Sequence, residues 1–457
     1  MINIGNELDF VLKSHQSSPK RQLNNVLPPD HLSSEINISI QDSPFTKEEI
    51  RGFLDSYLKY SVNTQHPYYM NQLWSQTEDS SLMGEILSAL TNTSMYTYEV
   101  APVATLLELK MSHFLSKMIW GKPTEGIMTS GGTASNMQAL LTARNTHFPE
   151  SKNDGLNHLK EKPVILCAKN SHYSIKRAAN IIGIGQSQLI EVEVNEQGSM
   201  SPQKLEQAIE TVISEGMKPF CVVSTAGTTV TGSYDDFNGI GKICQNHNLW
   251  YHIDGAYGGS SFFSKSHSHL LAGAQCADSF SWDFHKILGV HLPCAFLFTR
   301  EKGLLRKSIS SGNDAYLFHD DDSIDLGQSS LQCGRRNDIL KLWMTFMYNG
   351  VSGISKRVDT LFDIAHKLSD RIKNDSDFEL IMPPQSINVC FRYKNSQLTS
   401  KIREELNQTG KLMINYSTDN KGDFFRFAST NPYLSDADLY EVLHLIKTTG
   451  NKLNQEQ

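Results

Sequence analysis

The chain has 457 residues, more than one hydrophobic core usually holds, so we expect two or three domains that share interfaces. Apolar residues make up 39% and charged residues 20% of the chain, a composition that excludes a largely disordered protein. The net charge of −7, without a dense run of Lys and Arg, argues against a nucleic-acid partner.

The sequence also argues against a membrane partner and a metal site. No apolar run reaches membrane-spanning length, and the first 15 residues lack the basic start of a secretory signal. The seven cysteines are scattered, odd in number and without the spacing of zinc ligands, which favours reduced thiols. We therefore expect a cytoplasmic protein.

The N-terminal 64 residues predict a helical arm. The first 45 residues are rich in Ser, Asn, Gln and Pro, and Thr46-Lys-Glu-Glu then has the pattern of a helix cap. Apolar residues follow at helical spacing: Ile50, Phe53, Leu54, Tyr57 and Leu58. Such a helix needs a partner surface, so we interpret residues 1–64 as an arm and dimerisation segment.

Residues 65–350 predict a large α/β domain. Short apolar runs alternate there with helical segments such as Pro202–Ser214, which indicates a mostly parallel central sheet. The runs that predict strands are Val164–Ala168, Phe220–Ser224, Leu249–Ile253, Ser279–Trp282 and Ala295–Thr299.

Residues 351–457 predict a smaller α+β domain. A long helical stretch runs from Gly350 to about Ile372. Short strands are expected near Ile387–Arg392 and Phe424–Ala428, and a closing helix from Ser435.

A glycine-rich turn predicts a phosphate site. The segment from Thr129 to Arg144 passes from Ser-Gly-Gly-Thr into a helix, and paired glycines let the backbone approach an anion at the helix N-terminus. Gly132, Thr133 and Ser135 are the phosphate candidates. Taken alone, such a turn is often only a helix start.

Polar residues follow four of the predicted strands, in the order His172, Thr229, Asp254 and Lys286. In open α/β sheets ligands collect at the carboxyl ends of the strands, so these residues predict one site at that edge. Taken singly, His172 is better interpreted as a surface residue, and the segment around Thr229 equally well as an ordinary turn.

Lys286 and Asp254 indicate the chemistry of this site. Lys286 lies in Ser281-Trp-Asp-Phe-His-Lys, among apolar residues, and a lysine there suits an imine with the aldehyde of pyridoxal phosphate. Asp254 would pair with the protonated pyridine nitrogen and keep the ring an electron sink, because a buried carboxylate needs a cation.

Neighbouring residues fit the same cofactor. Ala256 is small enough to let the ring lie against the strand end, and His285 is suited to the phosphate. His172 would lie over the ring, with an N–H that reaches the substrate, and Thr229 would hydrogen-bond the cofactor.

Dispersed segments carry a family resemblance: His66-Pro-Tyr-Tyr-Met-Asn-Gln-Leu, Tyr96-Thr-Tyr-Glu-Val-Ala-Pro-Val, Thr225-Ala-Gly-Thr-Thr-Val, Leu331-Gln-Cys-Gly-Arg-Arg, Asn388-Val-Cys-Phe and Phe424-Phe-Arg. The chain resembles the group II pyridoxal-phosphate decarboxylases of the fold type I, aspartate aminotransferase-like superfamily. The resemblance runs from about residue 66 to 432 and is most detailed with the animal glutamate, cysteine sulfinate and aspartate decarboxylases.

This resemblance implies an obligate homodimer whose active sites are shared at the subunit interface, with residues around Cys333 near the partner's site. It also implies a loop tyrosine that protonates the substrate carbon after CO₂ leaves. Ala315-Tyr-Leu-Phe matches that loop, so Tyr316 joins Lys286 and His172 as the predicted catalytic residues.

The resemblance further implies a small acidic substrate. Arg426 is similar to the arginine that holds the side-chain acid of the substrate, with Gln72 nearby, and a guanidinium suits a carboxylate or a sulfinate. Trp74 replaces a serine common in glutamate decarboxylases, and Ser94 with Tyr96 resembles the cysteine sulfinate and aspartate branch. The indole should shorten the pocket, which is worth about 1–3 kcal/mol of discrimination.

We therefore expect α-decarboxylation of aspartate to β-alanine or of cysteine sulfinate to hypotaurine. Glutamate and 2,4-diaminobutyrate, decarboxylated by the same machinery, are the alternative substrates. Asp283-Phe284 replaces the usual Asn-Pro before His-Lys, as in bacterial diaminobutyrate decarboxylases, so similarity alone does not assign the substrate. Asp283 near a phosphate would be repulsive unless it turns away or bonds a donor. A decarboxylating oxidase, an aminotransferase and a scaffold without activity are the other interpretations.

Overall fold

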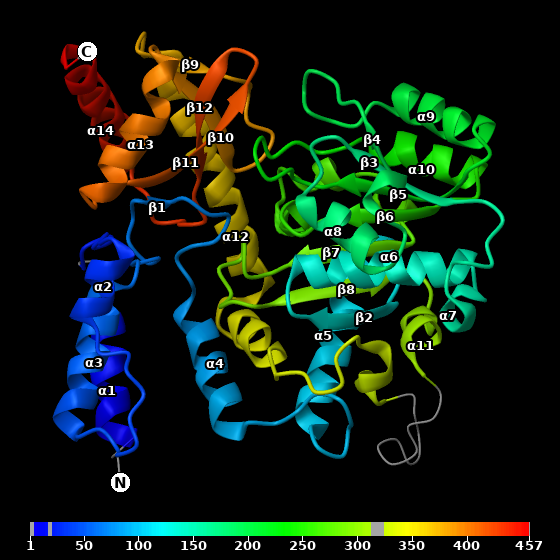
Figure 1. Cartoon of the computed structure of the whole chain (residues 1–457), viewed down its shortest axis with the longest axis horizontal. Helices are drawn as coiled ribbons and strands as arrows, with labels where there is room; N and C mark the ends of the chain where they lie inside the picture. The colour runs from blue at the N-terminus through cyan, green and yellow to red at the C-terminus, as the bar shows by residue number, and fades with distance from the viewer. Residues whose placement is uncertain (1–3, 17–20, 312–323, 457) are drawn as a thin grey trace. The chain divides into compact units, whose positions relative to one another are not determined.

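The computed structural model describes residues 4–16, 21–311 and 324–456 (Figure 1). The chain forms two compact units: a large unit, Thr77–Asp363, and a small unit made of Met1–Gln76 together with Ile364–Gln457. The units thus divide after residues 76 and 363, whereas the predicted domains divide after residues 64 and 350. Within the described residues, no helix is long and apolar enough to cross a membrane.

The large unit is built on a central sheet. In the described part of the chain its strand order is β2-β8-β7-β6-β5-β3-β4. The strands are β2 (Glu125–Thr129), β3 (Pro163–Ala168), β4 (Leu189–Val192), β5 (Lys218–Thr225), β6 (Trp250–Asp254), β7 (Ser279–Asp283) and β8 (Ala295–Thr299). Pairing is parallel from β7 to β4, and β8 is antiparallel to both β7 and β2. The predicted mostly parallel sheet is confirmed.

Helices surround this sheet in the large unit (Figure 1). They are α4 (Asp79–Thr91), α5 (Pro102–Trp120), α6 (Gly132–His147), α7 (Ser151–Asp154), α8 (Tyr173–Ile181), α9 (Pro202–Ser214), α10 (Phe237–Asn246), α11 (Leu304–Ile309) and the first part of α12 (Ile339–Lys373). Every residue of β3, β6, β7 and β8 is buried, as expected for strands covered on both faces.

The small unit combines residues from both ends of the chain. Its sheet has the order β1-β11-β12-β10-β9, and β1 pairs in parallel with β11. The strands are β1 (Tyr69–Met70), β9 (Phe378–Leu380), β10 (Asn388–Tyr393), β11 (Met413–Asp419) and β12 (Gly422–Ala428). The helices are α1 (Ile4–Gln16), α2 (Pro29–Glu35), α3 (Lys47–Tyr60), α13 (Thr399–Gln408), α14 (Asp436–Gln455) and the end of α12.

Local sequence signals explain where these helices begin and bend. Thr46 and Glu49 form the predicted capping box of α3, with the Thr46 N–H 2.7 Å from Glu49 Oε2. Ser435 caps α14 in the same way. In α12, Gly350 has a φ of 59°, a left-handed conformation that breaks the regular helix at this residue.

Candidate active site

A cavity of about 430 Å³ lies at the carboxyl ends of the parallel strands in the large unit. It is lined by the turn between β2 and α6, by His172 after β3, and by residues after β5, β6 and β7. Of the predicted cofactor residues, those that line this one cavity are Gly132, Thr133, His172, Thr229, Asp254, Ala256, His285 and Lys286. The structure therefore brings together residues that are far apart in the sequence.

Ser135 is the predicted cofactor residue that does not line the cavity. Its side chain is fully buried, and its hydroxyl lies 2.6 Å from Thr129 Oγ1. This contact ties the first turn of α6 to the end of β2, so the hydroxyl is engaged in holding the shape of the turn.

The lysine lies beside the turn at the start of α6. Lys286 Nζ is 3.2 Å from Asp283 Oδ2, and His285 Nε2 is 3.6 Å from the same oxygen. A Cβ atom placed on Gly132 would lie 2.8 Å from that oxygen, so Asp283 reaches the glycine turn itself. Burial lowers the pKa of His285.

Asp254 is a buried carboxylate at the end of β6, only 5% exposed. Its Oδ2 accepts a hydrogen bond from Asn136 Nδ2 at 2.8 Å, and its Oδ1 accepts one from the backbone N–H of Ala256 at 3.1 Å. Within the described residues no Lys or Arg forms an ion pair with it. Because a buried anion is costly without a counter-charge, this site suits a cationic ring nitrogen.

The start of α6 provides a place for an anion. Gly131 precedes the helix with a φ of 134°, and no side chain caps the first turn. The backbone N–H groups and the positive end of a helix dipole bind phosphate well. A lysine, a buried acid and an uncapped helix start on one cavity together fit pyridoxal phosphate.

His172 forms the N-cap of α8 and is half-buried. Its Nδ1 lies 2.8 Å from Ser174 Oγ and accepts the backbone N–H of the same residue at 3.3 Å. Burial lowers the pKa of His172, which favours a neutral ring at neutral pH.

The predicted substrate residues lie outside the cofactor cavity. In the small unit, Arg426 is buried on β12, and its Nη2 lies 2.5 Å from the carbonyl oxygen of Asn71. Trp74 packs on Tyr69 with ring centroids 5.8 Å apart. Gln72 is exposed. In the large unit, Ser94 and Tyr96 are half-buried in the segment between α4 and α5. Tyr316 lies outside the described residues.

Sequence reasoning missed Asn136. This residue lines the cavity and bonds Asp254, and it follows Gly132 by one helical turn, so both lie on the same face of α6. Helical spacing from the glycine turn was therefore the signal that could have identified it.

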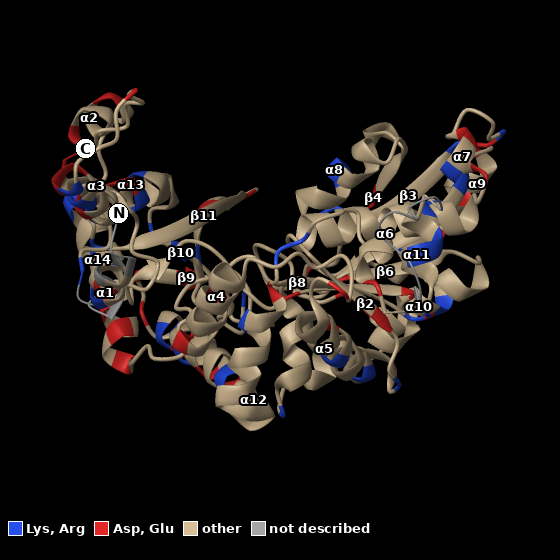
Figure 2. Ribbon diagram, turned by 90° about the horizontal axis from the view of Figure 1, so that it is seen from below, with Lys and Arg blue, Asp and Glu red and all other residues tan. Residues whose placement is uncertain are grey.

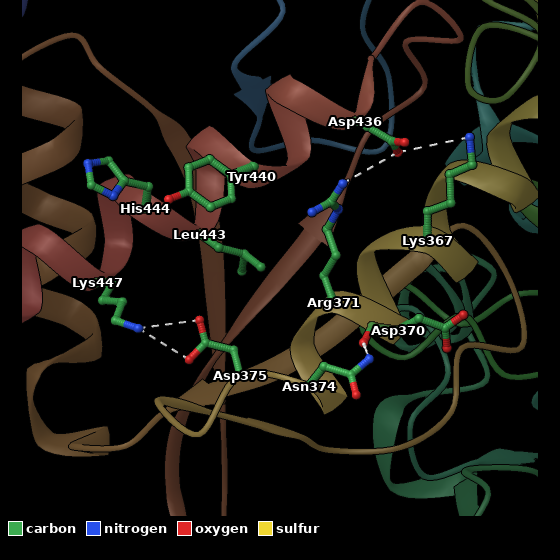
Figure 3. Close-up of a pocket in the computed structure, with 10 residues that line it drawn as sticks. All are labelled: Lys367, Asp370, Arg371, Asn374, Asp375, Asp436, Tyr440, Leu443, His444 and Lys447. Carbon is green, nitrogen blue, oxygen red and sulfur yellow. Dashed lines mark hydrogen bonds and ion pairs between the residues drawn. The ribbon is translucent and has the colours of Figure 1, made fainter.

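A second cavity, of about 610 Å³, lies in the small unit between α12 and α14 (Figure 3). Its cations face acids: Arg371 Nη2 lies 3.8 Å and Lys367 Nζ 4.0 Å from Asp436 Oδ1, and Lys447 Nζ lies 3.4 Å from Asp375 Oδ1. Since these charges compensate each other, this cavity offers no concentrated charge for a substrate.

Basic and acidic residues are also intermingled over both units (Figure 2). Among the described residues no cluster of His, Cys, Asp and Glu could hold a metal ion.

Comparison with known proteins agrees with this site. Residues 29–394 match the pyridoxal-dependent decarboxylase conserved domain. The chain is 35% identical to cysteine sulfinic acid decarboxylase of Mus musculus over 446 residues, which cover 93% of this chain and 90% of the relative. It is 34% identical to the acidic amino acid decarboxylase GADL1 of Homo sapiens, covering 93% of this chain and 86% of the relative.

Solved structures show the same similarity. The crystal structure of mouse CSAD matches with a TM-score of 0.92 and 33% identity, covering 97% of this chain and 98% of that one. A glutamate decarboxylase domain of a diaminobutyrate-pyruvate transaminase and L-2,4-diaminobutyrate decarboxylase from Vibrio parahaemolyticus matches with a TM-score of 0.86 and 26% identity, covering 98% and 96%.

The fold and the site together define a fold type I enzyme that uses pyridoxal phosphate. The chain belongs to the pyridoxal-dependent decarboxylase family and is a carboxy-lyase. The fold class, the cofactor and the type of reaction expected from the sequence are thus confirmed.

Low pH should destabilise the protein through His252, a fully buried residue of β6. Burial lowers its pKa from 6.5 to about 4, so between these values the unfolded chain binds more protons than the folded one. The stabilising contribution is therefore present above pH 6.5 and is lost as the pH falls towards 4. We expect the thermal midpoint of the wild type to fall between pH 7.5 and pH 5 by more than that of His252→Gln.

The matched control is His31→Gln, which removes an exposed histidine of α2. It should keep the wild-type difference between the two pH values. Equal pH dependence of the wild type and His252→Gln would contradict the assignment.

Proposed function

We propose that this carboxy-lyase removes the α-carboxyl group of a small acidic L-amino acid, aspartate or cysteine sulfinate. The observation that carries the site assignment is the arrangement of Lys286, Asp254 and the start of α6 around one cavity. When bound, pyridoxal phosphate accepts the electron pair that departing CO₂ leaves behind.

Each residue of the cavity has a role in this proposal. Lys286 holds the cofactor covalently through its amine, and Asp254 pairs with the ring nitrogen. Gly132 and Thr133 bind the phosphate through the helix start, while Ser135 keeps that turn in shape through Thr129.

The remaining cavity residues orient the ring and the substrate. His172 covers the ring and offers an N–H to the substrate carboxylate, and His285 and Thr229 bond the cofactor from the strand ends. Ala256 leaves room for the ring. Tyr316 is our proposed acid, which returns a proton to the α-carbon.

Arg426 supports an acidic substrate, because a guanidinium forms bidentate hydrogen bonds with a carboxylate or a sulfinate and disfavours an amine. We assign Gln72 and Trp74, from the same unit as Arg426, to substrate binding, and we assign the same role to Ser94 and Tyr96. The relatives named cysteine sulfinic acid decarboxylase and acidic amino acid decarboxylase support the same substrate class. Similarity to a 2,4-diaminobutyrate decarboxylase keeps this diamino acid as the second candidate substrate.

We also propose a homodimer with shared active sites, supported by exposed apolar side chains of the large unit. They belong to three helices: Met83, Leu87 and Leu90 of α4, Val103 and Leu106 of α5, and Met347, Tyr348 and Val351 of α12. Leu90, Val103 and Tyr348 are each more than two-thirds exposed, and burial of such side chains against a second copy of the chain would favour association.

The seven cysteines, all free, support a cytoplasmic location.

Borohydride treatment of the cofactor-loaded protein should attach the reduced cofactor to the peptide that contains Lys286, because the amine holds the cofactor covalently. Peptide mapping by mass spectrometry makes the measurement. Lys286→Arg should show no label and no amine product, while Lys265→Arg, a lysine of the same unit outside the cavity, should match the wild type. A label on any other lysine would overturn the assignment of Lys286.

A competition assay that offers aspartate, cysteine sulfinate, glutamate and 2,4-diaminobutyrate together should yield mainly β-alanine and hypotaurine. Trp74→Ser should lengthen the pocket. The amount of amine formed from glutamate, relative to β-alanine and hypotaurine, should then rise by about 10–200-fold. Quantifying the amines by chromatography makes the measurement. Preference for diaminobutyrate would reject the acidic substrate and leave the decarboxylase class intact.

The dimer proposal predicts that Leu90→Glu combined with Tyr348→Glu converts a dimer into monomers, since two buried charges in an apolar interface are costly. Sedimentation equilibrium measures the mass. Tyr433→Glu is the control, because Tyr433 is as exposed as Tyr348 but belongs to the small unit and lies outside residues 1–64. A monomeric wild type would refute the proposal.

A further inference from the structure

Asn136 connects the two residues that are proposed to contact the cofactor ring. It lies on α6, is 1% exposed, and its amide makes four hydrogen bonds. Nδ2 lies 2.8 Å from Asp254 Oδ2 and 3.0 Å from Ser174 Oγ. Oδ1 lies 3.0 Å from His252 Nε2 and 2.8 Å from Ser281 Oγ. An amide has two N–H donors and two oxygen lone pairs, so its hydrogen-bonding capacity is fully used.

The Asp254 carboxylate fixes the orientation of this amide. If the amide were rotated by 180°, its oxygen would lie 2.8 Å from Asp254 Oδ2, and two buried acceptors would face each other. The observed orientation instead directs an N–H at the carboxylate. Such a donor fixes the direction in which the acid points.

The hydrogen bonds of His252, which contacts the amide oxygen of Asn136, fix the tautomer of this histidine. Trp250 Nε1–H donates to Ser279 Oγ at 2.9 Å, and the Ser279 hydroxyl lies 2.8 Å from His252 Nδ1. The Asn136 amide oxygen can only accept, so the 3.0 Å contact at His252 Nε2 needs its hydrogen on that nitrogen, and Nδ1 is left to accept from Ser279. His252 therefore carries its hydrogen on Nε2 and donates it to Asn136.

The tautomer of His172 follows from its contacts with Ser174, which in turn bonds the amide nitrogen of Asn136. Ser174 Oγ accepts an N–H from Asn136 and lies 2.8 Å from His172 Nδ1. The backbone N–H of Ser174 donates to the same nitrogen at 3.3 Å, so Nδ1 is an acceptor and the Ser174 hydroxyl donates to it as well. A neutral His172 ring therefore holds its hydrogen on Nε2.

We propose that Asn136 is a positioning residue that acts on both sides of the cofactor at once: its amide orients ionised Asp254 and, through Ser174, sets His172 as the Nε2–H tautomer. This inference rests on the cofactor site proposed above. Asn136 thus couples the group that faces the ring nitrogen to the group that presents an N–H to the substrate, and it does so without contributing to the chemistry itself.

The first test is the tautomer of two histidines in the wild-type protein without cofactor. Nitrogen-15 NMR of histidine-labelled protein separates the tautomers, and the variants His172→Gln and His252→Gln assign the two signals. Both rings should carry hydrogen on Nε2. An Nδ1–H form of either ring would overturn the proposal, whatever the variants below show.

The second test uses Asn136→Asp, which has almost the same shape but lacks both N–H donors. The Ser174 hydroxyl should then donate to the new carboxylate and accept from His172 across the 2.8 Å contact, which outweighs the 3.3 Å contact with the backbone N–H, so the tautomer of His172 should reverse to Nδ1–H. The new carboxylate beside Asp254 should also weaken binding of pyridoxal phosphate by about 10–100-fold, measured by absorbance titration.

Two further variants separate coupling from damage to the fold. In Asn136→Asp/Ser174→Ala the hydroxyl is gone and the backbone N–H remains, so His172 should return to Nε2–H while cofactor binding stays weak. Thr142→Val on the same helix changes a buried hydroxyl that has no hydrogen-bond partner among the described residues, and it should resemble the wild type in both measurements.

The outcomes are distinct. A folded Asn136→Asp protein with an unchanged His172 tautomer would reject the coupling, and so would an equal change in Thr142→Val. Because the tautomers are measured without cofactor, a failure of borohydride to label Lys286 rejects the cofactor site and not the hydrogen-bond network.

Discussion

The active site depends on a buried anion. The Asp254 carboxylate stands at the end of a fully buried strand, receives N–H donors on both oxygens, and has no ion-pair partner among the described residues. A group in this position stabilises the fold less than it stabilises a bound cation. Burial of this carboxylate therefore lowers the stability of the large unit, and a bound cation would offset that cost. In the site that we propose, the ring nitrogen of the cofactor is this cation.

The parallel sheet is what places the other groups around that anion. Strands β3, β5, β6 and β7 pair in parallel, so their carboxyl ends meet at one edge and deliver His172, Thr229, Asp254 and Lys286 to one cavity. The turn from β2 into α6 adds the helix start. Helix α6 also carries Asn136, which joins the residues on two sides of the cavity.

The sequence predicted those features that have a local signal. The strands before Asp254 and Lys286 were recognisable because each is a short apolar run that ends in a polar residue. Thr46 and Ser435 marked the starts of two helices, because each has the sequence of an N-terminal cap. Strands β2 and β4 were missed. The pairing of β1 with β11 was also missed, because two residues carry no periodicity and their partner is far away in the sequence.

The orientation of side chains was the harder part of the site. Ser135 and Asn136 follow the same glycine turn, yet only Asn136 lines the cavity, whereas Ser135 bonds Thr129. A difference of one residue on a helix turns a side chain by about 100°, and the sequence alone does not show which face meets the strand ends. Asp283 stood out only as a departure from the family pattern, and its contact with Lys286 needed the structure.

The short parallel pair between β1 and β11 has an evolutionary consequence. It binds the stretch that carries Gln72 and Trp74 to the sheet that carries Arg426, and the Arg426 guanidinium adds a bond to Asn71. Residues encoded at opposite ends of the gene thus form one compact body. Recombination between two relatives would preserve this body only if both ends came from the same parent, so inheritance of the two termini should be linked more tightly than that of either terminus with the middle of the chain.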